Sequence, residues 1–329
     1  MTNPPTVPAE DLPRIVFLDR GVFHVPFPAP AFDHAWVEYA ATSNDDVVDR
    51  LRDATVAITD GVPISRATIE ASPRLRLIAV AATGYDQIDL AACADHDITV
   101  CNVRDWAVSV PEHVFALMLA LWRQLPSYQR AIAAGEWQRS PAYAVVLDPL
   151  PLALTGSTLG LVGYGVLGQR VETIARAFGM NVLIAERRGR EPRPGRTAFA
   201  AVLAQADVLV LVCPLTAETR GLIGARELAV MKADALLVNC ARGAIVDEAA
   251  LLAALRSGAI AGAGVDVLPE EPPTHGSPLL DADLPNLIVT PHVAWVSRQS
   301  QERLAREVIA NLDAWWAGSP RNVVSRSRR

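Results

Sequence analysis

Short runs of β-branched and aliphatic residues alternate with stretches of helical periodicity along nearly the whole chain. This alternation is typical of βα units, so it predicts parallel sheets covered by helices rather than an all-β or all-α fold. A first series predicts strands at 14–19, 56–60, 75–81 and 98–103. A second series predicts six strands, the number in a full dinucleotide-binding fold, at 159–162, 182–185, 208–212, 235–239, 261–266 and 287–290.

Two helices stand out in this pattern. Ser109-Val-Pro-Glu112 has the form of a capping box with proline in the first turn, and the helix it begins is apolar on nearly every face over 114–122. A helix of this kind is expected to be buried between domains or subunits. The last helix, 299–316, carries a single apolar stripe and is expected to end before Gly318.

Composition indicates an enzyme of the cytoplasm. The 329 residues are 51% hydrophobic and 20% charged, enough for a large core divided between two domains. The four cysteines lack metal-ligand spacing and lie mostly in apolar runs, which favours reduced thiols and no bound metal. The N-terminal stretch does not resemble a secretion signal, and the longest apolar run is too short to span a bilayer.

The charge of the chain argues against nucleic acid as a partner. The net charge is −6 at pH 7, so the protein has no general basic field. The only basic run is the tail Ser-Arg-Ser-Arg-Arg, which is read as a frayed terminus. A small molecule is therefore the expected ligand, with no membrane or nucleic-acid partner.

A glycine-rich turn, Gly163-Tyr-Gly165-Val-Leu-Gly168, lies between a predicted strand and a predicted helix. In that context the glycines allow a tight turn, the approach of backbone N–H groups to a pyrophosphate, and close packing of helix on strand. The next strand ends at Glu186, whose carboxylate is expected to accept both ribose hydroxyls of NAD. Arg187 and Arg188 would instead attract the 2′-phosphate of NADP. The sequence favours NAD, with NADP as the alternative.

Three further side chains supply the chemistry of a reduction. Arg242 and His292 each follow a predicted strand of the second series, and Glu271 stands in Glu-Glu-Pro-Pro. Reduction of a 2-keto acid has three requirements. The substrate carboxylate must be held, the charge that develops on the keto oxygen must be neutralised, and a proton must be delivered to that oxygen. A guanidinium suits the first two tasks, an imidazole suits the third, and a carboxylate beside the imidazole raises its pKa. These residues therefore predict transfer of hydride from a nicotinamide cofactor to a 2-keto acid.

Nearly the whole chain resembles the D-isomer-specific 2-hydroxyacid dehydrogenases. Besides the glycine-rich turn, the matching stretches are Ala-Ala-Thr83-Gly84-Tyr-Asp86, Ser109-Val-Pro-Glu112-His113, Cys213-Pro214-Leu-Thr216-Ala-Glu-Thr219, Asn239-Cys-Ala-Arg242-Gly243, Gly264-Val-Asp266-Val, Glu270-Glu271-Pro-Pro and Pro291-His292-Val-Ala-Trp295. The family pattern has alanine where Pro111 stands and tyrosine where Trp106 stands, so the pocket wall is expected to differ in shape.

The resemblance implies an α/β fold of two Rossmann-like domains. One is a doubly wound parallel-sheet NAD-binding domain at 105–291, and the other is a smaller, discontinuous flavodoxin-like substrate domain at 1–104 and 292–329. The substrate would bind in a cleft between them. The helix from Ser109 and the segment through Trp137 resemble the family's dimer surface, so a homodimer is expected.

The resemblance also assigns site residues. The catalytic set is Arg242, Glu271 and His292, with Glu271 preferred to Glu270 because the family places the carboxylate directly before proline. Substrate binding is expected from Thr83, Gly84, Arg242 and Trp295. Cofactor binding is expected from Gly163, Tyr164, Gly165, Val166, Leu167, Gly168, Glu186, Arg187, Cys213, Pro214, Thr219, Cys240 and Asp266, with Asp266 facing the nicotinamide carboxamide.

Within the family the chain looks most like the glycerate dehydrogenase and hydroxypyruvate reductase branch, so hydroxypyruvate or glyoxylate is the expected substrate. Formate dehydrogenases have glutamine where Glu271 stands, which counts against that activity. A phosphite dehydrogenase keeps all three catalytic groups and remains an alternative. A corepressor-like protein that senses NAD(H) is a second alternative, because such proteins can retain the same groups.

Overall fold

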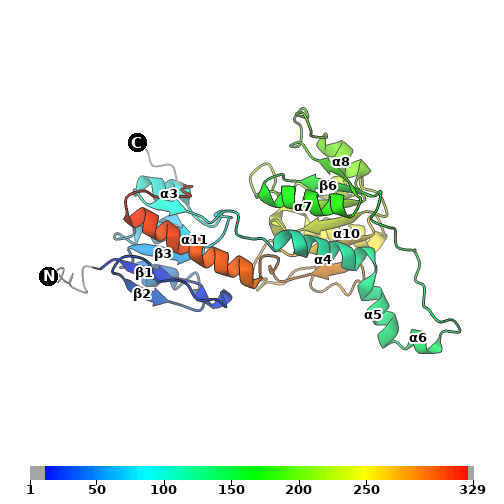
Figure 1. Cartoon of the computed structure of the whole chain (residues 1–329), viewed down its shortest axis with the longest axis horizontal. Helices are drawn as coiled ribbons and strands as arrows, with labels where there is room; N and C mark the ends of the chain where they lie inside the picture. The colour runs from blue at the N-terminus through cyan, green and yellow to red at the C-terminus, as the bar shows by residue number, and fades with distance from the viewer. Residues whose placement is uncertain (1–11, 325–329) are drawn as a thin grey trace. The chain divides into compact units, whose positions relative to one another are not determined.

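The computed structural model describes residues 12–324 and forms two compact units (Figure 1). Unit 1 comprises the described residues up to Ala107 together with those from Val296 onward, and unit 2 comprises Val108–Trp295. Each unit is built on its own parallel sheet, which confirms the predicted fold class. The N-terminal stretch 1–11 and the basic tail 325–329 lie outside the described residues.

The sheet of unit 1 has five parallel strands in the order β2-β1-β3-β4-β5, the order of flavodoxin-like folds. The strands are β1 (Arg14–Phe17), β2 (Ala35–Glu38), β3 (Val56–Thr59), β4 (Leu77–Val80) and β5 (Thr99–Cys101). Four of them confirm predicted strands. The sequence did not predict β2, which lies at the sheet edge and is only half-buried, so it lacks the apolar run of a central strand.

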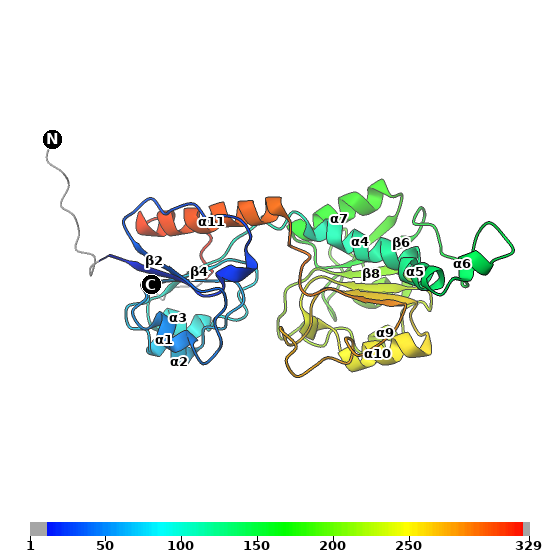
Figure 2. The same cartoon turned by 90° about the horizontal axis from the view of Figure 1, so that it is seen from below.

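Helices cover both faces of this sheet. Figure 2 shows α11 (Arg298–Trp316) on one face and α1 (Val47–Leu51), α2 (Arg66–Glu70) and α3 (Leu90–Asp95) on the other. The short 3₁₀ turn Arg20–Val22 follows β1. The buried residues of α11 include Leu304, Val308 and Leu312, which confirms the predicted apolar stripe.

The sheet of unit 2 has six parallel strands in the order β11-β10-β9-β8-β6-β7. All six were predicted: β6 (Thr158–Val162), β7 (Asn181–Ile184), β8 (Val208–Leu211), β9 (Leu236–Asn239), β10 (Gly262–Val265) and β11 (Leu287–Val289). The strand order reverses at β6, which pairs with β7 on one side and β8 on the other. In open α/β sheets, ligands bind at the carboxyl ends of strands beside such a reversal.

Unit 2 also has helices on both faces of its sheet. Figure 2 shows α4 and α7 on one face and α9 and α10 on the other. The helical bounds are α4 (Val110–Trp122), α7 (Val166–Ala177), α8 (Phe199–Gln205), α9 (Ala225–Leu228) and α10 (Glu248–Ser257), with a 3₁₀ turn at Gly243–Ile245. Buried side chains of α4 include Val114, Leu117, Met118 and Leu121, and the helix packs on β9, β10 and α7 within unit 2. Its predicted place between domains or subunits remains a prediction.

The predicted capping box at Ser109 is wrong. Ser109 has helical backbone angles and makes no side-chain cap bond, whereas a capping side chain requires an extended backbone at that residue. Its hydroxyl instead donates to the Ala294 carbonyl at 3.0 Å. The serine therefore ties the beginning of unit 2 to its end.

After α4 the chain forms an arm, defined here as residues 125–153, that projects from the body of unit 2 (Figures 1 and 2). It begins with α5 (Leu125–Ala133) and α6 (Glu136–Arg139) and continues as an extended loop. No helix in the described part of the chain combines the length and apolarity needed to cross a bilayer.

Candidate active site

The glycine-rich turn joins β6 to α7 at the point where the strand order reverses. Gly163 has φ +99°, and a Cβ there would lie 2.7 Å from the Cys213 amide nitrogen. A Cβ on Gly168 would lie 2.5 Å from the Gly163 carbonyl oxygen, so neither position accepts a larger residue without movement. Gly165 caps α7, and a Cβ there would meet no heavy atom of the described chain within 4 Å. This open helix N-terminus fits the pyrophosphate of a dinucleotide.

The remaining residues of the turn have separate roles. Val166 and Leu167 begin α7. The Tyr164 hydroxyl donates to Glu172, and the Tyr164 ring lies beneath the Arg196 guanidinium with 4.9 Å from the carbon to the ring centroid. The hydrogen bond to Glu172 raises the pKa of Tyr164, so the phenol stays neutral at physiological pH.

The two cysteines among the predicted cofactor residues after β8 and β9 have unreactive thiols. Burial raises the pKa of the Cys213 thiol to about 11 and raises that of Cys240 further still, so both remain protonated. Thr219 donates its hydroxyl proton to the Pro214 carbonyl at 2.7 Å and accepts from the Thr216 amide at 2.7 Å. These bonds fix the turn that follows β8.

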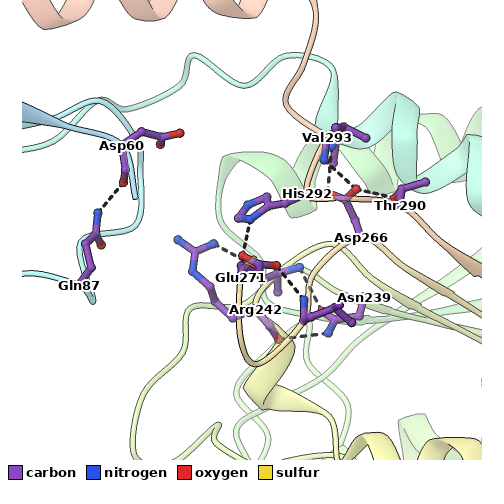
Figure 3. A network of polar contacts seen from close by, with 12 residues as sticks. Asp60, Gln87, Asn239, Arg242, Asp266, Glu271, Thr290, His292 and Val293 are labelled. Carbon is purple, nitrogen blue, oxygen red and sulfur yellow. Dashed lines mark hydrogen bonds and ion pairs between the residues drawn. The ribbon is translucent and has the colours of Figure 1, made fainter. Parts of the chain in front are cut away.

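Arg242, Glu271 and His292 converge at the carboxyl edge of the unit 2 sheet (Figure 3). Arg242 follows β9, Glu271 lies in the loop after β10, and His292 follows β11. The His292 Nδ1 lies 2.7 Å from Glu271 Oε2. Parallel strands bring side chains that are far apart in sequence to one edge of the sheet, which explains the convergence.

The electrostatics of His292 suit a proton donor. Partial burial lowers the pKa of the imidazole, but the hydrogen bond and negative charge of Glu271 outweigh this effect, so the net pKa is raised. The nearby Arg242 charge opposes the shift and Asp266 favours it. The side chain remains 39% exposed, so the protonated ring is accessible to a ligand.

Glu271, and not the neighbouring Glu270, contacts His292. The Glu271 Oε1 accepts from the Leu268 amide at 2.7 Å, so both carboxylate oxygens have partners and the side chain is oriented. Glu270 instead accepts from Thr274 and lies 2.7 Å from the His275 Nδ1. The loop from Leu268 onward packs closely on Gly243, beside Arg242, because a Cβ on that glycine would lie 1.9 Å from the Leu268 carbonyl carbon.

Asp266 holds the turn that carries His292. Its carboxylate accepts from the Thr290 hydroxyl at 2.5 Å and from the Val293 and Ala294 amides at 2.9 Å each (Figure 3). The His113 Nε2 lies 3.4 Å from it. The side chain is 1% exposed, and although burial raises its pKa, these bonds outweigh burial and lower it overall. The role predicted for Asp266 toward the nicotinamide remains a prediction.

His113 and Thr290 were not among the predicted site residues. Their side chains lie 3.0 Å apart, which links α4 to the end of β11. The signals available in the sequence were the place of His113 one turn into a buried helix and the position of Thr290 two residues before His292.

Thr83 and Gly84 belong to unit 1, where they follow β4. The Thr83 hydroxyl donates to the Val103 carbonyl at 3.1 Å and accepts from Trp106 Nε1 at 3.0 Å, while Asn102 Nδ2 donates to the Thr83 carbonyl at 2.7 Å. The next part of this loop is held by Gln87, whose Nε2 donates to the Asp60 carbonyl at 2.6 Å (Figure 3). Trp106, expected in a pocket wall, is buried and holds Thr83 in place.

Among residues 12–324, no group of three His, Cys, Asp or Glu side chains could hold a metal ion. Unit 2 thus carries the glycine-rich turn at 163–168 and, at the carboxyl edge of its sheet, the set of Arg242, Glu271 and His292. Residues 115–294 match the family model described as D-isomer specific 2-hydroxyacid dehydrogenase, NAD binding domain. The chain belongs to the D-isomer-specific 2-hydroxyacid dehydrogenase family.

Relatives within this family cover almost the whole chain. A glycerate dehydrogenase of Methylorubrum extorquens is 44% identical over 313 residues, which are 94% of this chain and 98% of that protein. A hydroxypyruvate reductase of Blautia hydrogenotrophica is 33% identical over 87% of this chain and 89% of its own. The solved structure of an NADPH-dependent glyoxylate/hydroxypyruvate reductase of Sinorhizobium meliloti, with NADP and malonate, is 29% identical with a TM-score of 0.80 and covers 97% of this chain and 99% of that one. This 2-hydroxyacid dehydrogenase is an oxidoreductase that uses a nicotinamide cofactor.

Proposed function

We propose that the enzyme reduces hydroxypyruvate or glyoxylate to the corresponding 2-hydroxy acid with a nicotinamide cofactor. The observation that carries the proposal is the oriented Glu271–His292 pair beside Arg242. The relatives named as glycerate dehydrogenase and hydroxypyruvate reductase support the choice of substrate.

Arg242 binds the substrate carboxylate and reaches toward the keto oxygen. A guanidinium offers several donors in one plane, so it can pair with a carboxylate and also stabilise negative charge that develops on the adjacent oxygen. The Arg242 Nη1 donates to the Ala241 carbonyl at 2.8 Å, which restricts where the guanidinium points. In this proposal, Thr83 and Gly84 contribute backbone N–H groups to the same carboxylate.

His292 protonates the keto oxygen in reduction and accepts that proton in oxidation. Glu271 binds Nδ1, so Nε2 is the nitrogen that faces the substrate. Glu271 stabilises the imidazolium and keeps the acid protonated to a higher pH. A dihydronicotinamide cofactor held at the Gly163–Gly168 turn would supply the hydride for C2 of the substrate.

The residues present fit such a cofactor. The Gly163–Gly168 turn leaves space at the N-terminus of α7 for the pyrophosphate, and the Cys213 and Cys240 thiols are neutral. In this proposal the segment after β7 decides between NAD and NADP. The sequence favoured NAD because the Glu186 carboxylate was expected to accept the ribose hydroxyls. There Arg193 pairs with that carboxylate.

A substrate panel tests this proposal. We expect NAD(P)H oxidation to be most efficient with hydroxypyruvate, followed by glyoxylate, with pyruvate well behind and phenylpyruvate last. A polar group that pairs with the hydroxyl of hydroxypyruvate would be left unpaired by pyruvate. A branched or aryl keto acid as the best substrate would overturn the assignment. Turnover of phosphite, or cofactor binding without any turnover, would favour the two alternative functions.

We also propose that the enzyme is a cytoplasmic homodimer. The arm carries large apolar side chains at high exposure, including Trp137 at 55%, Tyr143 at 94% and Leu150 at 65%. Apolar surface of this extent on a projecting segment is typical of a protein–protein contact. A second copy of the chain is the proposed partner.

A further inference from the structure

The segment after β7 folds back over the end of that strand. Ala185 forms a parallel bridge with Thr197, and the Glu186 amide donates to the Thr197 carbonyl at 2.8 Å. The ten residues between, 187–196, include five arginines and one glutamate. This basic loop lies where a dinucleotide-binding sheet receives the adenosine ribose, at the end of its second strand.

Glu186 is enclosed at the base of this loop. Its side chain is 3% exposed, and Arg193 binds it with two donors, Nε to Oε2 at 2.6 Å and Nη2 to Oε1 at 2.8 Å. The amides of Arg187 and Arg193 donate to the same carboxylate at 2.9 and 3.3 Å.

Two consequences follow for a dinucleotide. Ribose hydroxyls cannot reach the Glu186 carboxylate in this arrangement, because protein donors surround it and hardly any of it is exposed. The Arg193 hydrogen bonds also lower the pKa of Glu186 to about 2, so the pair remains ionised throughout the working pH range and its charges cancel. The repulsion that would exclude a 2′-phosphate is therefore largely removed.

The other arginines differ in how their charge is balanced. Arg188 pairs with Glu227 and lies over the Phe199 ring. Arg187 is exposed directly beside Glu186, and the Arg193 side chain is 64% exposed, so both remain accessible to a solute. Arg196 lies over the Tyr164 ring, next to the glycine-rich turn. The loop thus presents positive charge around a carboxylate that is already neutralised.

We propose that Arg193 determines cofactor selectivity in this enzyme by neutralising Glu186, so that the site prefers NADPH and Arg187 contributes to binding the 2′-phosphate. The inference reverses the preference for NAD that the sequence suggested. The kinetic test of this inference rests on the proposed hydride transfer. The binding test does not, because cofactor selectivity can be measured by nucleotide binding alone.

The test uses two probes that differ only in the phosphate under discussion, adenosine 2′,5′-bisphosphate and 5′-AMP. Calorimetric titration of the full-length wild-type enzyme should show that the bisphosphate binds at least about tenfold tighter, as expected for one or two charge-assisted hydrogen bonds. The ratio of kcat/KM for NADPH to that for NADH should favour NADPH by a similar factor. Failure of the proposed substrate reaction would leave the binding experiment unaffected.

Arg193→Met removes the guanidinium but keeps an unbranched side chain of similar length. The exposed charge on Glu186 should then repel the phosphate, so the bisphosphate preference should fall at least about tenfold. Binding of 5′-AMP should hold or improve, which also shows that the variant is folded. Adding Glu186→Gln to this variant should restore most of the preference, because the carboxylate is the source of the repulsion.

Two further variants serve as controls. Arg190→Met removes the same charge from the same loop without touching Glu186, and should change the preference less than about threefold. Glu186→Gln alone should change 5′-AMP affinity less than about twofold, because the carboxylate does not serve the ribose. This variant also keeps the proposal testable if Arg193→Met does not fold.

Several results would overturn the inference. One is a wild-type preference for 5′-AMP and NADH. Another is an equal loss of bisphosphate preference in Arg190→Met and Arg193→Met. A third is a double variant Arg193→Met, Glu186→Gln whose bisphosphate preference is as low as that of Arg193→Met alone. A large loss of 5′-AMP binding in Glu186→Gln would do the same, since it would show that the carboxylate binds the ribose directly.

Discussion

Arg242 lies three residues beyond the end of β9, and in the proposed function its guanidinium contacts both the substrate carboxylate and the oxygen that gains charge. Arg242→Ala should therefore lower kcat/KM by an amount equivalent to a loss of at least about 3 kcal/mol of transition-state stabilisation, because the charge-assisted bonds to the ground state and to the transition state are both lost. Arg242→Lys should recover only part of the activity, because an ammonium cannot form the planar two-donor contact. Steady-state kinetics with hydroxypyruvate check this, and activity of the alanine variant within about threefold of wild type would contradict it.

Glu271→Gln tests the acid. Glu271 raises the pKa of His292, so the protonated, proton-donating form persists to higher pH in the wild type. Removing the charge lowers that pKa, and the alkaline limb of the reductive pH profile should move to lower pH. The measurement is kcat/KM for reduction across pH 5 to about 10.

Glu270→Gln is the matched control for this change. Glu270 contacts Thr274 and His275 rather than His292, so its profile should superimpose on that of the wild type. A shifted pH profile in Glu270→Gln, with an unchanged profile in Glu271→Gln, would show that Glu270 rather than Glu271 tunes the pKa of His292.

At the level of single residues the sequence indicated the polar groups better than their partners. Arg242, Glu271 and His292 were singled out because their side-chain types fit the chemistry and because they matched a family motif. Arg193 was not, because six residues of irregular loop lie between it and Glu186 and no periodicity predicts how such a loop folds back. Trp106 was expected in a pocket wall, and nothing in the sequence indicated that its Nε1 donates to Thr83.

At the scale of elements, the loop after β10 and the turn after β9 are in direct backbone contact. Gly243→Ala would place a Cβ 1.9 Å from the Leu268 carbonyl carbon, so the loop must move. Because the Leu268 amide binds Glu271, this movement should disturb the Glu271–His292 pair. We expect a stability loss of about 1–3 kcal/mol from overpacking and a loss of kcat/KM of about tenfold or more.

Thermal unfolding and kinetics measured on the same samples check this prediction. Gly61→Ala is the control, because a Cβ at Gly61 would meet no heavy atom of the described chain within 4 Å. Wild-type kinetics in Gly243→Ala would show that the two loops are not coupled in this way.

The elements themselves were largely predictable. Central strands such as β8 and β9 are buried throughout, so each appears as a short apolar run bounded by polar residues. The edge strand β2 has no such run, and the N-terminus of α4 depends on a contact between Ser109 and Ala294, which are 185 residues apart. Local patterns carry no information about a contact of that range.

At the scale of the whole molecule, the arm gives a prediction about assembly. Val146 and Leu150 are 67% and 65% exposed on it. If they pack against a second copy, the double variant Val146→Asp, Leu150→Asp should convert a dimer into a monomer, because burying unpaired carboxylates costs several kcal/mol. Light scattering coupled to size exclusion measures this, with Val230→Asp, on an exposed site outside the arm, as the control.

The bond between the Ser109 hydroxyl and the Ala294 carbonyl has a practical consequence. Unit 2 is one uninterrupted piece of chain, and this bond brings its two ends together. A domain whose termini meet can be inserted into a loop of a host protein or closed head to tail. We therefore expect residues 108–295 to tolerate insertion into a loop of an unrelated protein, which would make nucleotide binding a controllable input for that protein.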